Sequence, residues 1–436
     1  MTDLPARVSR RNVFLLLVDY CTFGVGMTFL GVTTVLPSLV RLLGGGPVVV
    51  GSLGAIQSGG WLLPQLLAGR YVAGRPLVKR FIVIPAGVGR GLLALFPGVL
   101  MLFAGRAPAV ALAVLLAVST CFWVADALAS VAWFDLVAKA IPAERRGRVM
   151  GAGGSIGGLL GIGAGWAVTG ILARPDPFPS SYALLIVLAS ACFGVGLASM
   201  AAIHEPRGAG RGEAQAGWRD YIPRLGLILR TDARFVWLTL TRWLGGFADM
   251  AAAFYVLFAT DRLGVPQQEI GLFLSAGVAG SLLSGVLLGP LRDRKGSACI
   301  VTATLALRCF CPAAALLAPL VAGGRPQAAV GILVLIYAAM GMANGSHMIG
   351  FMNYLLEIAP PAERSTYMGL GNTLSGVLML APFLAGWIVR LASYQVLFAV
   401  ALGFGILGLA TAVAGPQRIA AWRAARPRAA GSVRGT

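Results

Sequence analysis

Six ionisable side chains stand inside long apolar stretches of the sequence. They are three aspartates and three arginines: Asp19, Arg90, Asp126, Arg242, Asp249 and Arg308. An ionisable group at the centre of a bilayer costs about 2.5–3.5 kcal/mol on insertion scales and usually marks a functional position. A carboxylate in a cavity of low dielectric takes up a proton more readily, and a nearby arginine opposes this uptake. Such groups can therefore exchange a proton when their access or a bound molecule changes.

The depths of these charges permit three ion pairs. At a rise of 1.5 Å per residue, the six groups lie about 12–22 Å from the nearest flanking basic residue. Groups of similar depth can meet across helices, which gives the pairs Arg90–Asp126, Arg308–Asp249 and Asp19–Arg242. Static salt bridges that hold helices together are the other interpretation of the same pairs.

Two uncharged polar residues, Asn344 and His347, lie in the apolar stretch 328–358. Histidine titrates near neutrality, although a lone histidine in a helix is more often simply packed or hydrogen-bonded. Arg90 and Arg308 are the expected intramembrane charge partners. The expected cavity and proton-coupling residues are Asp19, Asp126, Asp249, Arg242, Asn344 and His347.

Twelve apolar stretches are long enough to hold these residues in a membrane. The chain has 436 residues, of which 58% are hydrophobic and 12% charged, whereas soluble domains carry roughly 25% charged residues. Roughly twenty apolar residues cross a bilayer as a helix, and the alternation typical of barrel strands is absent. The sequence predicts an all-α membrane protein with twelve transmembrane helices at 14–37, 48–69, 81–103, 108–138, 149–172, 181–203, 235–259, 270–291, 298–322, 328–358, 367–389 and 392–415.

The basic residues predict how the protein is oriented. With the N-terminus in the cytoplasm, 26 of the 35 Lys and Arg fall in cytoplasmic segments and 6 in outer loops. The positive-inside rule then places both termini in the cytoplasm, and we expect a multi-pass protein of the cell membrane. The net charge of +19 indicates attraction to anionic lipids, because nucleic-acid binding would need a soluble basic domain.

Sequence features recur half a chain apart. PAERRGRVMG at 142–151 is echoed by PAERSTYMG at 361–369, and Arg90 by Arg308 at a spacing of 218. Since six is even, both copies have the same orientation, so we expect two six-helix bundles related by a pseudo-twofold axis along the membrane normal. The expected domains are the bundles 1–203 and 235–415, a cytoplasmic linker with an interfacial helix at 204–234, and a disordered basic cytoplasmic tail at 416–436.

The duplicated layout and the loop motifs resemble the major facilitator superfamily of secondary transporters. The loop GPLRDRKG at 289–296 matches the family motif G-x-x-x-D-R-x-G, whose Asp and Arg hold the cytoplasmic gate through charge contacts. The first-half copy departs from it, because Gly74 stands where the Asp should be. The resemblance implies a cytoplasmic gate of Arg75, Glu144, Arg145, Gly289, Asp293, Arg294, Gly296, Glu363 and Arg364.

The resemblance also assigns roles to whole helices. In that family the first, fourth, seventh and tenth helices line a central cavity, so all three buried acids and His347 fall on lining helices. The fifth helix lies between the halves there. In this chain it carries Gly157, Gly161 and Gly165, a small-residue face that lets another backbone approach closely.

Transport of a small molecule by alternating access is the function that these features favour. No G-x-x-x-x-G-K-[ST] motif is present, so an ion gradient is expected to supply the energy. Proton-coupled export of an amphipathic compound is favoured, because the expected lining helices are rich in aromatic residues and poor in polar ones. Import of a polar metabolite is one alternative. The other is a transporter-like fold that acts as a receptor or scramblase without gradient-driven turnover.

Other classes of function find little support in the sequence. The six cysteines lie in apolar stretches without metal-ligand spacing to histidine, and no nucleophile–base pair typical of an enzyme is recognised. We therefore expect no enzyme, no metal site, no cofactor and no nucleic-acid partner. The expected partners are a small-molecule substrate, protons and anionic lipids, and the expected state is a monomer.

Overall fold

The computed structural model describes residues 6–72, 75–141, 143–175, 178–206, 226–360 and 363–425. Within these ranges the chain forms helices and no strands. Residues 207–225 of the expected linker and 426–436 of the expected tail lie outside the described residues.

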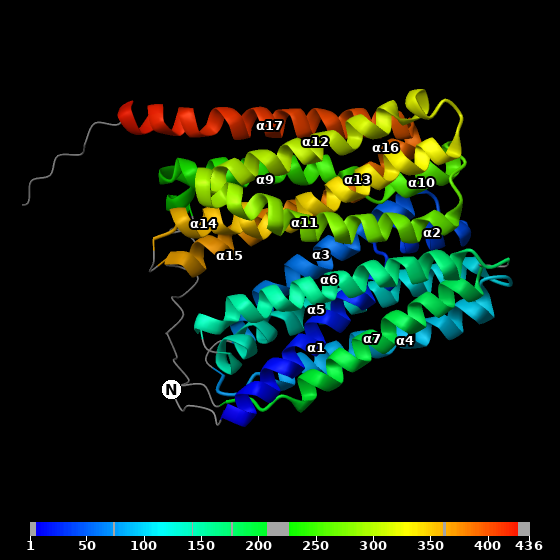
Figure 1. Ribbon diagram of the computed structural model, residues 1–436, viewed down its shortest axis with the longest axis horizontal. Coiled ribbons are helices and arrows are strands. Elements are labelled where there is room, and N and C mark those ends of the chain that lie inside the picture. The colour runs from blue at the N-terminus through cyan, green and yellow to red at the C-terminus, as the bar shows by residue number, and fades with distance from the viewer. Residues whose placement is uncertain are drawn as a thin grey trace, which may run out of the picture.

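Long helices run roughly side by side along one axis of the molecule (Figure 1). The first half contains α1 (Ala6–Leu30), α2 (Val35–Leu42), α3 (Pro47–Val72), α4 (Arg80–Phe103), α5 (Pro108–Ala140), α6 (Ala143–Leu172) and α7 (Ser180–Ala202). The second half contains α9 (Ala233–Ala248), η1 (Asp249–Ala251), α10 (Phe254–Arg262), η2 (Gln267–Glu269), α11 (Ile270–Lys295), α12 (Ser297–Ala322), α13 (Pro326–His347), η3 (Met348–Met352), α14 (Asn353–Ile358), α15 (Arg364–Ser375), η5 (Gly376–Met379), α16 (Leu380–Leu391) and α17 (Tyr394–Ala425).

Eleven of the expected spans are confirmed as helices long and apolar enough to cross a membrane, within the part of the chain that the structure describes. The chain is therefore a multi-pass membrane protein. The second expected span, 48–69, falls in α3, a helix of 26 residues that is not among the eleven. The number twelve and the pseudo-twofold axis thus stay predictions.

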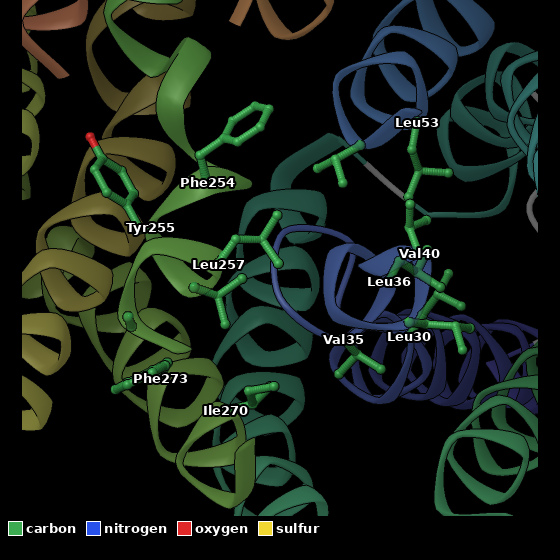
Figure 2. Close-up of a cluster of buried hydrophobic side chains, with 14 of the residues drawn as sticks. Leu30, Val35, Leu36, Val40, Leu53, Phe254, Tyr255, Leu257, Ile270 and Phe273 are labelled. Carbon is green, nitrogen blue, oxygen red and sulfur yellow. The ribbon is translucent and has the colours of Figure 1, made fainter. Parts of the chain in front are cut away.

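The two halves share one hydrophobic core at the end of the molecule where α2 and α10 lie, which we call the distal end (Figure 1). Figure 2 shows residues of α1, α2 and α3 facing residues of α10 and α11 across this core: Leu30, Val35, Leu36, Val40 and Leu53, opposite Phe254, Leu257, Ile270 and Phe273. Within a membrane, close van der Waals packing and not removal of apolar surface from water favours such contacts, and the interdigitated side chains of this core hold the halves together at the distal end.

At the opposite end, where α1 begins and α17 ends, each half has its own core. We call this the terminal end. The core of the first half includes Leu16, Val78 and Leu136, and that of the second half includes Phe235 and Leu355. The halves are therefore joined by a shared core at the distal end and packed separately at the terminal end.

A polar contact accompanies the shared core at the distal end. Arg41 Nε of α2 lies 3.5 Å from Asp261 Oδ2 of α10, and the Tyr394 hydroxyl of α17 donates a hydrogen bond of 3.0 Å to the same oxygen. We call these three residues the distal clasp. It ties the first half to the second by charge, where the core ties them by apolar contact.

Glycines let the halves approach closely along their length. Helix α6 packs on α11, and a Cβ atom on Gly165 would lie 2.7 Å from the Gly271 carbonyl oxygen. Helix α3 packs on α16, where a Cβ atom on Gly51 would lie 3.2 Å from Gly386 Cα. Real Cβ atoms do not tolerate the shorter of these distances, so the helices can meet only because glycine stands there. The expected position of the fifth span between the halves is confirmed.

We predict that Gly165→Ala weakens the packing of α6 on α11. The added methyl group would lie 2.7 Å from the Gly271 carbonyl oxygen and 2.9 Å from the Ser275 backbone nitrogen, both in α11, and overpacking of this kind costs about 1–3 kcal/mol. Thermal unfolding of the purified protein should show a lower melting temperature for this variant. Gly163→Ala is the matched control, because no atom lies within 4 Å of its added methyl group. Equal melting temperatures for the two variants would contradict the packing described.

Candidate functional site

The first half encloses a cavity of about 380 Å³ that contains three of the expected charges, Asp19, Arg90 and Asp126. They come from α1, α4 and α5 in that order. We call it the acidic cavity. Much of its remaining lining is aromatic: Tyr20, Phe23, Trp61, Trp133 and Phe134.

The acidic cavity contains one arginine and two carboxylates. Arg90 Nη2 lies 3.7 Å from Asp126 Oδ1, and Arg90 Nη1 donates a hydrogen bond of 3.0 Å to the Phe193 carbonyl oxygen. Asp19 Oδ2 accepts a hydrogen bond of 2.9 Å from Trp133 Nε1. Both carboxylates are buried. With both ionised the cavity holds one negative charge in excess, and a single proton would remove that excess.

Small residues bring these charges together. Gly89 precedes Arg90 on α4, and a Cβ atom there would lie 2.8 Å from Ala125 Cβ of α5. Because glycine and alanine stand at this contact, α4 and α5 lie close enough for Arg90 to reach Asp126. In α7, Gly196 plays the same part, since a Cβ atom there would lie 2.9 Å from Asp19 Oδ1.

A second cavity, of about 250 Å³, lies between the halves. Ser58 of α3 lines it from the first half, and Arg242, Asp249, Arg308 and His347 line it from the second. We call it the basic cavity. Its ion pair is tight, because Arg308 Nη2 lies 2.7 Å from Asp249 Oδ2.

Arg242 has no such partner. Among the described residues it forms neither an ion pair nor a hydrogen bond. The Nε atom of Arg308 is also buried without a hydrogen-bond partner. With one carboxylate and two guanidinium groups, and with His347 neutral, the basic cavity carries one positive charge in excess.

Two residues of the basic cavity stand where helices are interrupted. Asp249 begins the short 3-10 helix η1, which separates α9 from α10. His347 is the last residue of α13, and the π-helix Met348–Met352 follows it. Interrupted helices near the membrane midplane leave backbone groups free to contact a ligand, and π-helical turns are frequent at functional sites.

Two of the three expected ion pairs are confirmed, Arg90–Asp126 and Arg308–Asp249. The third, Asp19–Arg242, is wrong: Asp19 lines the acidic cavity and Arg242 the basic one. His347 stacks on Phe351 with ring centroids 5.4 Å apart. Asn344 is exposed and belongs to neither cavity.

Among the residues that the structure describes, the second-half loop motif makes no ion pair with another helix. Asp293 pairs with its neighbour Arg292 at 2.7 Å, and Arg294 is exposed. Gly289 lies in α11, and Gly296 follows its end with a φ of +81°. The expected gate residues on this motif therefore stay a prediction, and the terminal end is not closed through them.

The other expected gate residues are spread over the same end. Arg75 accepts a hydrogen bond of 3.3 Å from Lys139 Nζ at its carbonyl oxygen, Arg145 is exposed, and Glu363 precedes α15. The side chains of Glu144 and Arg364 lie outside the described residues.

Sequence reasoning missed several polar contacts. Glu205 accepts hydrogen bonds from the backbone N–H groups of Val78 (2.6 Å) and Lys79 (2.9 Å), which anchors the residues after α7 to the start of α4. Thr304 and Ser346 share a buried hydrogen bond of 2.6 Å between α12 and α13. The position of Glu205, just beyond the sixth expected span, was the available signal for the first contact. Nothing in the sequence marks the second.

The described residues bring no three metal-ligating side chains of the His, Cys, Asp and Glu type together. The two cavities instead offer carboxylates, guanidinium groups, one imidazole and aromatic rings. These groups can bind protons, hold an oxyanion or contact an apolar body. The arrangement is suited to binding a small molecule within the membrane.

The chain is similar to membrane transporters. No protein-family model matches it. It is 34% identical over 148 residues to the uncharacterized transporter slc-17.2 of Caenorhabditis elegans, a match that covers 31% of this chain and only 29% of that curated relative. The similarity to solved structures covers a much larger share of this chain, although the sequence identity is lower.

Two of these structures illustrate the similarity. The nucleoside transporter NupG is 13% identical with a TM-score of 0.64, covering 94% of this chain and 99% of that one. A bacterial homologue of the iron transporter ferroportin in its inward-facing state is 17% identical with a TM-score of 0.63, covering 95% and 99%. At these identities the similarity shows a shared fold.

We predict that Arg308 and Asp249 act as a unit. Either Arg308→Gln or Asp249→Asn alone leaves one charge in the basic cavity without its partner, and that is costly. The double variant should recover part of the loss, with a coupling free energy of about 0.5–3 kcal/mol. Melting temperatures of the four proteins provide the measurement. Asp293→Asn, which alters an exposed pair, should have little effect, and strictly additive losses in the double variant would refute the coupling.

Proposed function

We propose that this chain, which has the fold of the major facilitator superfamily, is a secondary active transporter of a small molecule. It would work by alternating access, in which the two halves rock about a binding site near the middle of the membrane. The main support for this proposal is the arrangement of the buried charges. Two cavities with ionisable groups lie between the shared distal core and the separately packed terminal end.

The proposed orientation puts the terminal end in the cytoplasm. Most Lys and Arg among the described residues fall in segments at that end, as the positive-inside rule requires. The structure then corresponds to a state closed to the outside by the distal core and clasp. The glycine contacts of α6 with α11 and of α3 with α16 would serve as the surfaces on which the halves move.

Protons are the proposed coupling ion. Asp19 and Asp126 are buried in one cavity with a single arginine, so one ionised carboxylate lacks a compensating charge. In a medium of low dielectric an uncompensated charge is costly, and binding one proton relieves the cost. Exposure of this cavity first to one side of the membrane and then to the other would carry that proton across.

Export of an amphipathic compound is the proposed direction and cargo class. The support comes from the acidic cavity, whose lining combines aromatic rings with two carboxylates. Import is the second candidate, and one observation favours it. One proton in the acidic cavity and one anion in the basic cavity would together leave both cavities neutral, so the two would move in the same direction. A receptor or scramblase role without turnover is the remaining alternative.

We predict that Asp19→Asn and Asp126→Asn each abolish proton coupling. Each variant removes one of the two carboxylates that share Arg90. The measurement is substrate-dependent proton flux in liposomes, with the pH gradient applied in both polarities to separate export from import. Asp135→Asn is the matched control, because Asp135 is on the same helix as Asp126 but half-exposed and paired with Lys139 at 2.6 Å. Undiminished substrate-dependent proton flux in both test variants would refute the proposed role of these carboxylates in proton coupling.

We predict that linking the distal clasp stops transport. In a background without the six native cysteines, Arg41→Cys and Asp261→Cys would be joined by a short bifunctional thiol reagent with a reducible bond. Because the clasp must open for the cavities to face outward, the linked protein should be inactive, and reduction should restore activity. Single cysteine variants treated with the same reagent provide the control. Unchanged transport by the linked protein would refute alternating access at this end.

A further inference from the structure

The unpaired Arg242 is the starting point of an inference about the cargo, and this inference rests on the proposed transport function. An arginine within the membrane is costly unless its charge is compensated. Arg90 and Arg308 offset that cost with a carboxylate each. Arg242 lines the basic cavity without any partner among the described residues.

Other hydrogen-bond donors lie near Arg242 in the basic cavity. The Nε atom of Arg308 is buried and makes no hydrogen bond, and Ser58 brings a hydroxyl group to the cavity from α3. The only carboxylate in the lining, Asp249, is already held by Arg308 at 2.7 Å. The cavity therefore has unused donors and an uncompensated positive charge, which is the complement of an oxyanion.

The space available sets the size of the anionic group. At about 250 Å³ the basic cavity is smaller than the roughly 300–1,000 Å³ of sites that enclose a whole drug-sized ligand. It adjoins a further cavity of about 130 Å³, because the two share Ser58, Asp249, Met250 and Pro382. The remaining lining of the smaller cavity is mostly apolar and includes Val50 and Leu53 of α3.

We infer that the cargo is an amphipathic carboxylate, whose carboxylate group binds Arg242 in the basic cavity and whose apolar body lies in the adjoining cavity. A guanidinium group matches a carboxylate through two parallel N–H donors, which adds geometry to charge. Ser58 and the shared residues belong to both halves, so the bound molecule touches α3 and the second half together. Movement of one half against the other then changes the distances between the groups that bind the molecule.

The test uses three probes with one skeleton: 4-phenylbutyrate, 4-phenylbutanamide and 4-phenylbutylamine. Binding to the purified full chain in detergent is measured through the rise in melting temperature with ligand concentration, since a ligand that binds the folded form stabilises it. The carboxylate should bind at least about tenfold more tightly than the amide, and the amine should bind weakest, because charge-assisted hydrogen bonds are about twice as strong as neutral ones.

Variants assign the effect to the proposed site. Arg242→Gln should remove the preference for the carboxylate, and Arg242→Lys should keep part of it, because the charge stays and the planar fork is lost. Arg390→Gln removes the same charge at an exposed position, where the guanidinium lies over the Trp387 ring, and should leave the preference intact. The melting temperature of each unliganded variant shows whether it folds.

The inference is overturned if phenylbutyrate binds no more tightly than the amide, or if Arg242→Gln retains the preference. These measurements need no gradient and no turnover. A protein that prefers the carboxylate but shows no transport would therefore count against the proposed function alone, and a transporter that prefers the amine would count against this inference alone.

Discussion

The cost of a charge in an apolar medium governs the arrangement of this protein. Arg90 of α4 and Arg308 of α12 are each paired with an aspartate from a different helical segment. The distance from guanidinium nitrogen to carboxylate oxygen is 3.7 Å in the first half and 2.7 Å in the second. These pairs tie α4 to α5 and α12 to the break after α9. Because partners of a buried pair cannot separate without a large penalty, the pairs hold each half as one body. In the proposed transport cycle, motion would be confined to the surfaces between the halves, where the contacts are mostly apolar or made by glycine, apart from polar contacts such as the distal clasp.

Small residues make these charge contacts possible. A guanidinium group reaches a carboxylate across a helix pair only if the backbones lie close. In the first half, Gly89 beside Arg90 permits this close approach. In the second half, a Cβ atom added to Gly245 would lie only 2.7 Å from Arg308 Nη1. Glycine in the middle of a membrane helix weakens the helix itself. The ion pair and the packing that this close approach permits offset the loss of helix stability.

The sequence predicts those features of the structure that depend only on position along the chain, such as the length of a span and the depth of a residue in the membrane. Apolar length identified the spans, and depth along the helix axis identified the pairs Arg90–Asp126 and Arg308–Asp249. Depth says nothing about rotation around an axis, and for this reason Asp19 was matched with Arg242 and not with Trp133. The breaks at Asp249 and His347 escaped prediction because no proline stands near either residue.

The two cavities differ in charge although they belong to halves that echo each other. At the spacing of 218 that relates Arg90 to Arg308, the counterpart of Asp126 is Asn344. The second half has an uncharged amide at this position, and Arg308 pairs with Asp249 at the interruption after α9. Arg242, whose counterpart at the same spacing is Gly24, adds a positive charge that the first half lacks. The first cavity thus holds two carboxylates with one guanidinium group, and the second holds one carboxylate with two guanidinium groups, so their opposite excess charges follow from the positions at which the two copies differ.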